Sequence, residues 1–196
     1  MFESKQVAKR ERRFIGAKSC NPIPIRHDLV HEALVQTSLD PATRAIEHIP
    51  TASFSGTTFE IDAIVLTRDD GRFALDVADA RPLRDIDDEG LVLLALRDLG
   101  LRLLSLTASQ IRSEPRFTNS RLVWACRNAR VGVGLRVRIL QTLQDEGAMR
   151  LGHLLAAIVS PVDPAPAVMA LACADLLEID LMHEPLGPAT TVRLRK

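Results

Sequence analysis

The sequence predicts an α/β protein in which helices flank a mixed central sheet, followed by a small C-terminal winged helix-turn-helix domain. Three observations support this fold class. Strand-forming residues at 59–66 and 72–78 flank the turn "RDDGR", and helical periodicity both precedes and follows this pair. A short apolar run at 101–106 offers a further strand. Beyond residue 134, three apolar-periodic helices precede two short strands, which is the order of a winged helix-turn-helix.

The composition is typical of a folded protein of the reducing cytoplasm. Hydrophobic residues make up 46% of the 196 residues, which is enough for a core of ordinary size. Basic and acidic residues both number 25, so the overall charge does not attract the chain to nucleic acid or to membranes. The three cysteines form no C-x-x-C pair, and no window approaches the ~18 apolar residues of a membrane span. We therefore expect a cytoplasmic protein with no membrane segment.

A basic arm covers residues 1–27. Such an arm can lie along a phosphate backbone, and it is equally consistent with a solvated chain terminus. Its basic residues are Lys5, Lys9, Arg10, Arg12, Arg13, Lys18 and Arg26, against Glu3 and Glu11.

The first helix is expected in the stretch "RHDLVHEALVQTSL", where apolar residues such as Leu29 and Ala33 recur at helical spacing. It should end near Asp40-Pro41, because proline disfavours a helical conformation in the residue before it. Residues 42–58 contain many turn formers and are expected to be irregular or a strand. The hairpin of 59–66 and 72–78 follows, with Asp70-Gly71 as its turn.

Local signals also define the second half of the sheet domain. The stretch "DIDDEGLVLLALRDLG" predicts a helix with acids in its first turn and Gly100 as its C-terminal stop. Residues 101–106 predict a short buried strand. The Thr-x-x-Gln of "TASQI" then predicts a capping box that opens a short helix, which Pro115 closes. A further helix is expected at 119–127 around Trp124.

The joint between domains is expected at "RVGVG", residues 130–134. The predicted division is therefore a basic arm at 1–27, an α/β domain at 28–130 and a winged-helix domain at 131–196. In the last of these, helices are expected near 135–145, 150–159 and 166–177, and strands at 178–183 and 189–195.

Residues 1–130 resemble the TnsA-type endonuclease subunit of heteromeric transposases, in the restriction-endonuclease-like PD-(D/E)-x-K superfamily. The resemblance is carried by "SLDPATRAIEHIP", "IDAIVLTRDDGRFALDVAD" and "LGLRLLSLTASQIRSEPRFTNSRLVW". The last stretch is the most specific, since it combines strand, capped helix, proline and an Asn-x-Arg-Leu step in one register. The winged-helix order of the C-terminal part also agrees with the two-domain layout of that family.

The resemblance implies a Mg²⁺ site at the sheet edge that uses Asp62 and Asp76 as catalytic, metal-binding acids. Two carboxylates on adjacent strands can share one hard divalent ion. The third acid of the family comes from the early helix. Val30 falls near that position, Asp28 and Glu32 lie beside it, and Glu32 is the preferred candidate. An aspartate on a half-buried strand is, without the resemblance, more often a surface acid or a partner of arginine.

The departures from the family pattern favour a nuclease fold over nuclease activity. Ile61 replaces the proline, Asp76 is one methylene shorter than glutamate, and Ala78 stands where the catalytic lysine belongs. Loss of one such preorganised donor lowers a rate by a factor on the order of 10²–10³. Arg81 and Arg84 lie nearby, but an arginine does not deprotonate water and acts only electrostatically. The cofactor is thus Mg²⁺ if the site is active and none if it is inactive.

DNA contact is expected from the sheet domain if its arginines share a face with the basic arm; the arginines are equally consistent with solvated charges spread around helices. Its candidate DNA-binding residues are Lys9, Arg10, Arg12, Arg13, Arg116 and Arg121. By contrast, "PAPAVMALACADLLEID" offers none of the Arg, Lys, Asn or Gln side chains that a DNA-reading helix exposes. The C-terminal domain is therefore interpreted as a docking domain for protein, or as one that packs on its own first domain. Its basic end, Arg193, Arg195 and Lys196, is interpreted as a charged tail.

The motif "HDLVH" resembles a zinc-binding H-E-x-x-H helix. It has aspartate in the glutamate position and no third ligand at a suitable spacing, so a polar helix face is the preferred interpretation.

The sequence thus predicts a DNA-processing protein with an impaired hydrolytic centre that acts by binding DNA and partner subunits. By resemblance, those partners are a transposase or recombinase and an ATPase regulator. An active Mg²⁺-dependent endonuclease and a non-enzymatic winged-helix adaptor or regulator are the alternatives.

Overall fold

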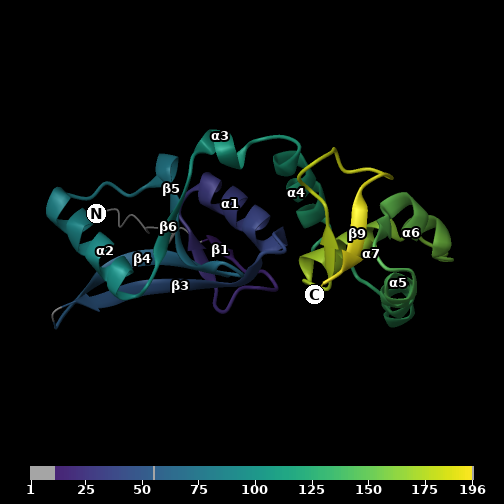
Figure 1. The fold of residues 1–196 in the computed structure, drawn as a ribbon, viewed down its shortest axis with the longest axis horizontal. Coiled ribbons are helices and arrows are strands. Elements are labelled where there is room, and N and C mark those ends of the chain that lie inside the picture. Colours follow the sequence, from purple (N-terminus) through teal and green to yellow (C-terminus); the bar gives the residue numbers. More distant parts are fainter. Residues whose placement is uncertain (1–11, 55, 196) are drawn as a thin grey trace, which may run out of the picture.

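The computed structural model describes residues 12–54 and 56–195, and Lys9 and Arg10 therefore lie outside the described residues. The molecule is elongated, with a four-stranded sheet at one end and a small three-stranded sheet with its helices at the other (Figure 1). Two helices, α1 and α4, lie between these ends. Among the described residues, no helix is long and apolar enough to cross a membrane.

The central sheet is mixed, as the sequence predicts, and has the order β3-β4-β5-β6. The first three strands are antiparallel neighbours, whereas β6 runs parallel to β5 after a crossover through α2. The strands are β3 (Thr43–Phe54), β4 (Thr57–Arg68), β5 (Gly71–Val77) and β6 (Arg102–Leu106). Asp70-Gly71 forms the predicted β4–β5 turn, and Gly71 has a φ of 133° that favours glycine.

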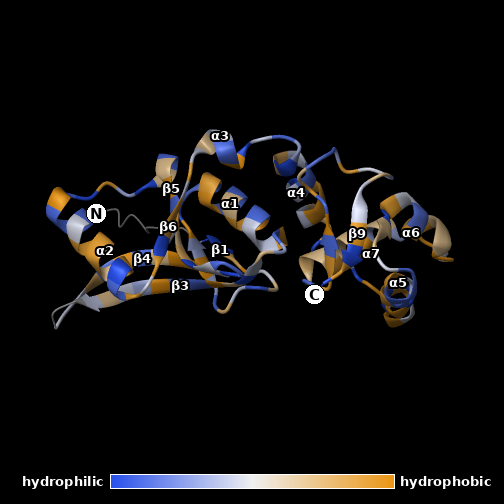
Figure 2. Cartoon of the chain, viewed as in Figure 1, coloured by the Kyte–Doolittle hydropathy of each residue, from blue (hydrophilic) through white to orange (hydrophobic). Residues whose placement is uncertain are grey.

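Helices cover both faces of this sheet because successive strand residues point to opposite sides. Hydrophobic and hydrophilic residues are interspersed along β3, whereas β4 carries a continuous hydrophobic run at residues 63–66 (Figure 2). Helix α2 (Ile86–Asp98) packs through Val92 and Leu96 on one face, where Val65 is buried. Helix α1 (Asp28–Leu39) packs through Leu34 on the other face, against Leu66. The helices flanking the sheet are thus positioned by the two-residue period of its strands.

The predicted helix boundaries in this part are confirmed by their caps. The carboxylate of Asp85 accepts a hydrogen bond from the backbone N–H of Asp88 at 2.8 Å and opens α2. Gly100, with a φ of 68°, follows its end. Thr107 and Gln110 form the predicted capping box of α3 (Ala108–Ile111).

Other details differ from the sequence-based expectation. Residues 43–54 form one long strand where irregular structure was the alternative. The prediction that the strand at 101–106 is buried is wrong: β6 is the edge of the sheet, and Leu103 is 48% exposed. Helix α4 (Arg116–Ala125) begins three residues earlier than predicted, directly after Pro115. Three short elements were not predicted: β1 (Arg12–Phe14), β2 (Ile23–Ile25) and the 3-10 turn η1 (Ala78–Ala80).

The C-terminal elements follow the order helix, strand, helix, helix, strand, strand. They are α5 (Val133–Glu146), β7 (Met149–Arg150), α6 (Leu151–Ala157), α7 (Ala165–Cys173), β8 (Leu177–Ile179) and β9 (Thr191–Leu194). The three strands form an antiparallel sheet in the order β7-β9-β8. The two-residue strand β7 was not predicted, and α7 and β8 end earlier than the sequence pattern suggested.

One hydrophobic core joins the two ends of the molecule. The rings of Phe14 and Trp124 stack at a centroid distance of 5.1 Å, and the same buried cluster includes Ile139 and Val168. Helix α7 is buried from Ala167 to Cys173. A helix buried in this way has no free face for the DNA major groove.

Buried polar contacts also join the two ends. The side chain of Asn119 on α4 is 1% exposed and donates hydrogen bonds to the carbonyls of Leu181 (3.0 Å) and Glu184 (2.8 Å). Its carbonyl oxygen accepts one from the backbone N–H of Leu186 at 2.8 Å. All three of these hydrogen bonds connect the Asn119 side chain to the segment between β8 and β9.

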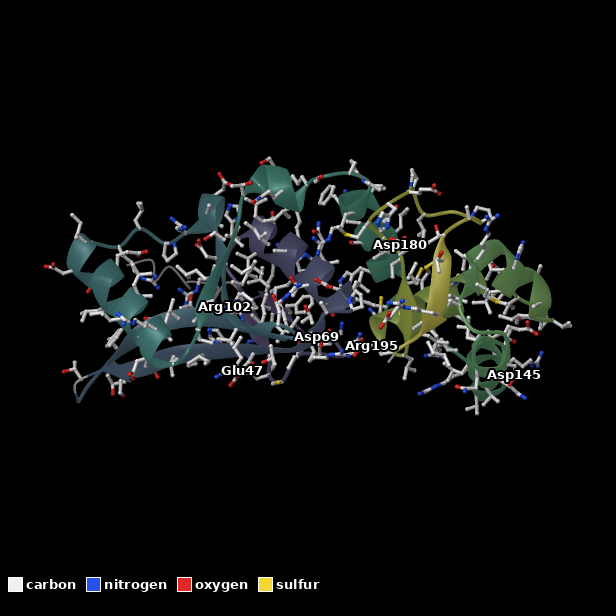
Figure 3. All side chains as sticks on the ribbon, in the orientation of Figure 1. Glu47, Asp69, Arg102, Asp145, Asp180 and Arg195 are labelled. Atoms are coloured by element: carbon white, nitrogen blue, oxygen red, sulfur yellow. The ribbon has the colours of Figure 1, made fainter. Side chains whose placement is uncertain are left out.

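Charged side chains form a second link, here called the Lys18–Arg195 network. Arg195 donates to the carboxylate of Glu178 at 2.9 Å and to the carbonyl of Pro41 at 2.5 Å, and it contacts Asp175 at 3.2 Å. Lys18, also 3.2 Å from Asp175, donates to the carbonyl of Asp40 at 2.7 Å. Arg195 lies in the middle of the molecule, near Asp69 (Figure 3). The interpretation of Arg195 as part of a charged tail is therefore wrong, since its side chain is only 11% exposed.

We predict that Asn119→Ala lowers the free energy of unfolding by about 2–4 kcal/mol, because it leaves the buried carbonyl of Leu181 and the part-buried carbonyl of Glu184 and N–H of Leu186 without their partner. Denaturant unfolding followed by circular dichroism measures the change. Asn128→Ala, at an exposed position, is the control and should change stability by less than about 0.5 kcal/mol. Equal losses in the two variants would contradict the proposed role of Asn119.

Candidate functional site

The aspartate cleft opens where β4 and β5 separate. Their pairing runs from Arg68–Gly71 to Ile64–Leu75 and stops there, so Asp62 and Asp76 lie beyond the last paired residues. Both aspartates line a cleft of about 570 Å³, which we call the aspartate cleft. The start of α1 and one side of α2 complete its walls. The structure thus brings the two predicted acids to one cleft.

Asp62 sits at an irregularity of the β3–β4 ladder. The pairing shifts between Ile49 and Thr51, and Asp62 adopts a φ of 48°. Aspartate tolerates this left-handed conformation better than most residues. The local bend directs the carboxylate to His48, whose Nε2 lies 2.8 Å from Oδ1, and to Arg26, whose Nη1 lies 3.0 Å from Oδ2. Both carboxylate oxygens of Asp62 therefore already have a partner.

Asp76 is held even more completely. It pairs with Ser105 across β5 and β6, and the Ser105 hydroxyl donates to Oδ2 at 2.5 Å. The guanidinium of Arg81 donates from Nε to Oδ1 at 2.6 Å and from Nη2 to Oδ2. This bidentate, charge-assisted pair and the Ser105 hydrogen bond lower the pKa of Asp76 below its usual value. The carboxylate stays ionised, but its lone pairs are directed at the protein's own donors.

The predicted third acid does not join the two aspartates. Glu32 lines a separate cleft of about 420 Å³, where its carboxylate accepts a hydrogen bond from Arg112 Nε at 2.9 Å. On α1, Val30 lines the aspartate cleft and Glu32 does not. No group of three or more His, Cys, Asp or Glu side chains among the described residues is arranged to hold a metal ion.

Arginines provide the cationic charge near the aspartates. Ala78, which stands where the resemblance would place a lysine, begins the short 3-10 helix η1. Arg84 donates to the carbonyl of Ile61 at 3.0 Å and pairs with Glu89 at 4.0 Å. Of the two arginines considered from sequence, Arg81 is therefore the one that bonds a cleft aspartate. The described lining residues of the cleft include no lysine.

Sequence reasoning missed Arg26, His48 and Ser105. His48 and Ser105 lie on strands next to those of Asp62 and Asp76, and Arg26 approaches Asp62 from the segment between β2 and α1. Such contacts have no signal in the local sequence. The strand period could place Asp76 on a face, but it could not identify its neighbour on β6.

The predicted DNA-binding arginines lie in different surroundings. Arg12 is 63% exposed and forms a surface ion pair with Asp28 at 2.7 Å, and Arg13 is exposed on the same strand. Arg121 lies over the ring of Phe117 on the surface of α4. Arg116 is half-buried and lines a different cleft from Arg121.

The two histidines of "HDLVH" have separate structural positions. His27 caps α1, with Nδ1 accepting a hydrogen bond from the backbone N–H of Leu29 at 3.2 Å. His31 packs edge-on against Phe14, and burial lowers its pKa.

A comparison with models of known protein families gives no match, and a comparison with curated proteins gives none either. A functional assignment therefore depends on the cleft geometry and on the resemblance carried by the sequence.

We predict that the pKa of Asp76 lies below its usual value in the folded protein because Arg81 and Ser105 hydrogen-bond its carboxylate, and that Arg81→Gln raises this pKa. Because the folded-state pKa is lowered, the Arg81 pair stabilises the fold above the unfolded pKa. This contribution is lost as the pH falls through the folded value. Carboxyl-detected NMR titration measures the pKa directly.

Arg84→Gln is the matched control, because Arg84 bonds a backbone carbonyl and not Asp76. An Asp76 pKa that is unchanged in Arg81→Gln, or equally raised in both variants, would show that Arg81 does not set it.

Proposed function

We propose that the chain is a DNA-processing protein of TnsA-like, restriction-endonuclease-like fold whose hydrolytic centre is impaired, and which acts by binding DNA and partner subunits. By resemblance the partners are a transposase or recombinase and an ATPase regulator. The observed mixed sheet with flanking helices is compatible with this fold.

The observation that carries the proposal is the bonding of Asp76. A Mg²⁺ ion needs carboxylate oxygens as ligands at close range. Both oxygens of Asp76 instead accept hydrogen bonds from Arg81, and one also accepts the Ser105 hydroxyl. A metal ion would have to displace a bidentate guanidinium, and two further positions expected to carry catalytic groups hold Ala78 and Val30.

The C-terminal part supports a binding role. Its order of helix, strand, helix, helix, strand and strand agrees with a winged helix. Helix α7, the third in this order, is covered by its own first domain. We therefore assign DNA contact to the sheet domain and its basic arm, and interpret the C-terminal part as a module for protein contacts.

An active endonuclease remains the second candidate, and one observation favours it. Arg81 brings a cationic group directly to Asp76, and in this candidate function it stabilises the charge of a bound phosphate. The guanidinium does not act as a base, and this candidate therefore needs a water molecule activated by metal.

We predict no metal-dependent cleavage by the full chain. Plasmid and linear duplex DNA are incubated with protein and Mg²⁺ or Mn²⁺, and strand breaks are resolved on denaturing gels. The rate should not exceed that of Asp76→Ala. Robust cleavage that Asp76→Ala abolishes would overturn the impairment and favour the endonuclease.

We also predict that duplex DNA binding weakens steeply with salt. Arg12→Gln should weaken binding to all sequences alike and make the slope of log K against log[salt] shallower by about 1, because one phosphate contact is lost. Fluorescence anisotropy at several salt concentrations measures both quantities. Arg97→Gln, on the exposed side of α2, is the control. Binding that is absent or independent of salt would favour the non-enzymatic adaptor or regulator.

A further inference from the structure

Arg116 is a half-buried cation with no direct ion pair or hydrogen bond among the described residues. Its side chain lines a cleft of about 590 Å³ between the end of α1 and the strands β8 and β9, which we call the Arg116 cleft. Among residues 12–54 and 56–195, none accepts a hydrogen bond from this guanidinium or forms an ion pair with it. Burial lowers the pKa of Arg116, and the nearby Asp40 carboxylate offsets this only in part. An arginine in this state is normally paired.

The carboxylates that share the cleft are committed to other groups. Asp40 accepts hydrogen bonds from Arg68 Nη1 and from the backbone N–H of Ala42, both at 2.9 Å. Glu178 is bonded by Arg193 at 2.5 Å and by Arg195 at 2.9 Å.

Asp180, the third acid of the cleft wall, is likewise occupied. It accepts from the backbone N–H of Met182 at 3.0 Å and contacts the His183 ring at 2.8 Å. Rearranging any of these acids onto Arg116 would leave another donor without its partner.

Ser120 provides an independent observation one turn further along α4. It is 1% exposed, borders the same cleft, and its hydroxyl has no hydrogen-bond partner among the described residues. A buried hydroxyl without a partner is uncommon in folded proteins. Arg116 and Ser120, four residues apart, share one side of the helix. Together they offer an anion a charged fork and a hydroxyl donor.

The remaining wall indicates the chemistry of the ligand. Arg68, Arg116 and Arg193 are matched by the three acids Asp40, Glu178 and Asp180, so the formal charge of the lining is zero. A dianion would therefore be repelled more than a monoanion. Leu39, Leu181 and Met182 add apolar surface.

We propose that the Arg116 cleft binds a small monocarboxylate that carries an apolar body. Its carboxylate accepts hydrogen bonds from Arg116 and Ser120, and its apolar body packs on the leucine and methionine side chains. This site does not depend on the proposed DNA function. Residues from the sheet end and from the C-terminal end of the molecule line this cleft. A bound ligand would therefore also strengthen the contact between these two ends.

Benzoate tests the proposal as a probe, with benzamide as its uncharged analogue and inorganic phosphate as a polar anion. Each is titrated into the full chain and followed by ¹H–¹⁵N NMR. We expect saturable shifts with benzoate that map to α4 and β8, at least tenfold weaker binding of benzamide, and no competition by equimolar phosphate. Equal effects of benzoate and benzamide, stronger binding of phosphate, or no saturation with benzoate would overturn the proposal.

Variants identify the binding groups. Arg116→Gln should weaken benzoate binding about tenfold or more, as expected for loss of a charged hydrogen-bonding partner. Ser120→Ala should weaken it a few-fold, whereas Arg121→Gln, on the same helix but in another cleft, should leave it unchanged.

Thermal unfolding supplies a readout that does not depend on the NMR assignment. Because Arg116 is unpaired, Arg116→Gln should be folded and at least as stable as the parent without benzoate, and benzoate should stabilise only the parent. Unchanged benzoate affinity in both Arg116→Gln and Ser120→Ala, or equal stabilisation of parent and Arg116→Gln, would show that these residues form no carboxylate site.

Discussion

The Lys18–Arg195 network is the constraint on which the arrangement of the molecule depends. It joins the last strand to the start of β3, with Asp175 between its two cations. Removing one member of such a partly buried set leaves a charge without its counter-ion, which typically destabilises a protein by several kcal/mol. Because this network fixes the C-terminal strands against the sheet domain, α7 is covered and the Arg116 cleft lies at the resulting junction.

The carboxylates of the aspartate cleft are likewise neutralised by arginines of the chain. Asp62 and Asp76 lie where two strands separate, a position suited to a shared ion, yet each has its own cationic partner. Arginine provides the charge compensation that a metal would supply, without activating water. Under the function proposed above, the cleft would be a hydrolytic site whose acids are held by arginines instead of a metal ion.

Local signals allowed much of the fold to be predicted. The Asp70-Gly71 turn, the Thr107 capping box and the stop at Gly100 depend on residues only a few positions apart, and all three were predicted correctly. The exposure of β6 and the burial of Arg195 depend on which element lies beside them, so sequence periodicity did not reveal them. The site divides in the same way: the two aspartates came from the resemblance carried by the sequence, whereas their partners on other elements required the tertiary structure.

The central claim is that the chain's own arginines, and not a metal ion, hold the two aspartates. Anomalous diffraction from crystals of the full chain grown in Mn²⁺ tests it most directly. The account predicts an intact Arg81–Asp76 pair and no anomalous peak between Asp62 and Asp76. A manganese ion bound by both carboxylates, with Arg81 displaced into solvent, would contradict it.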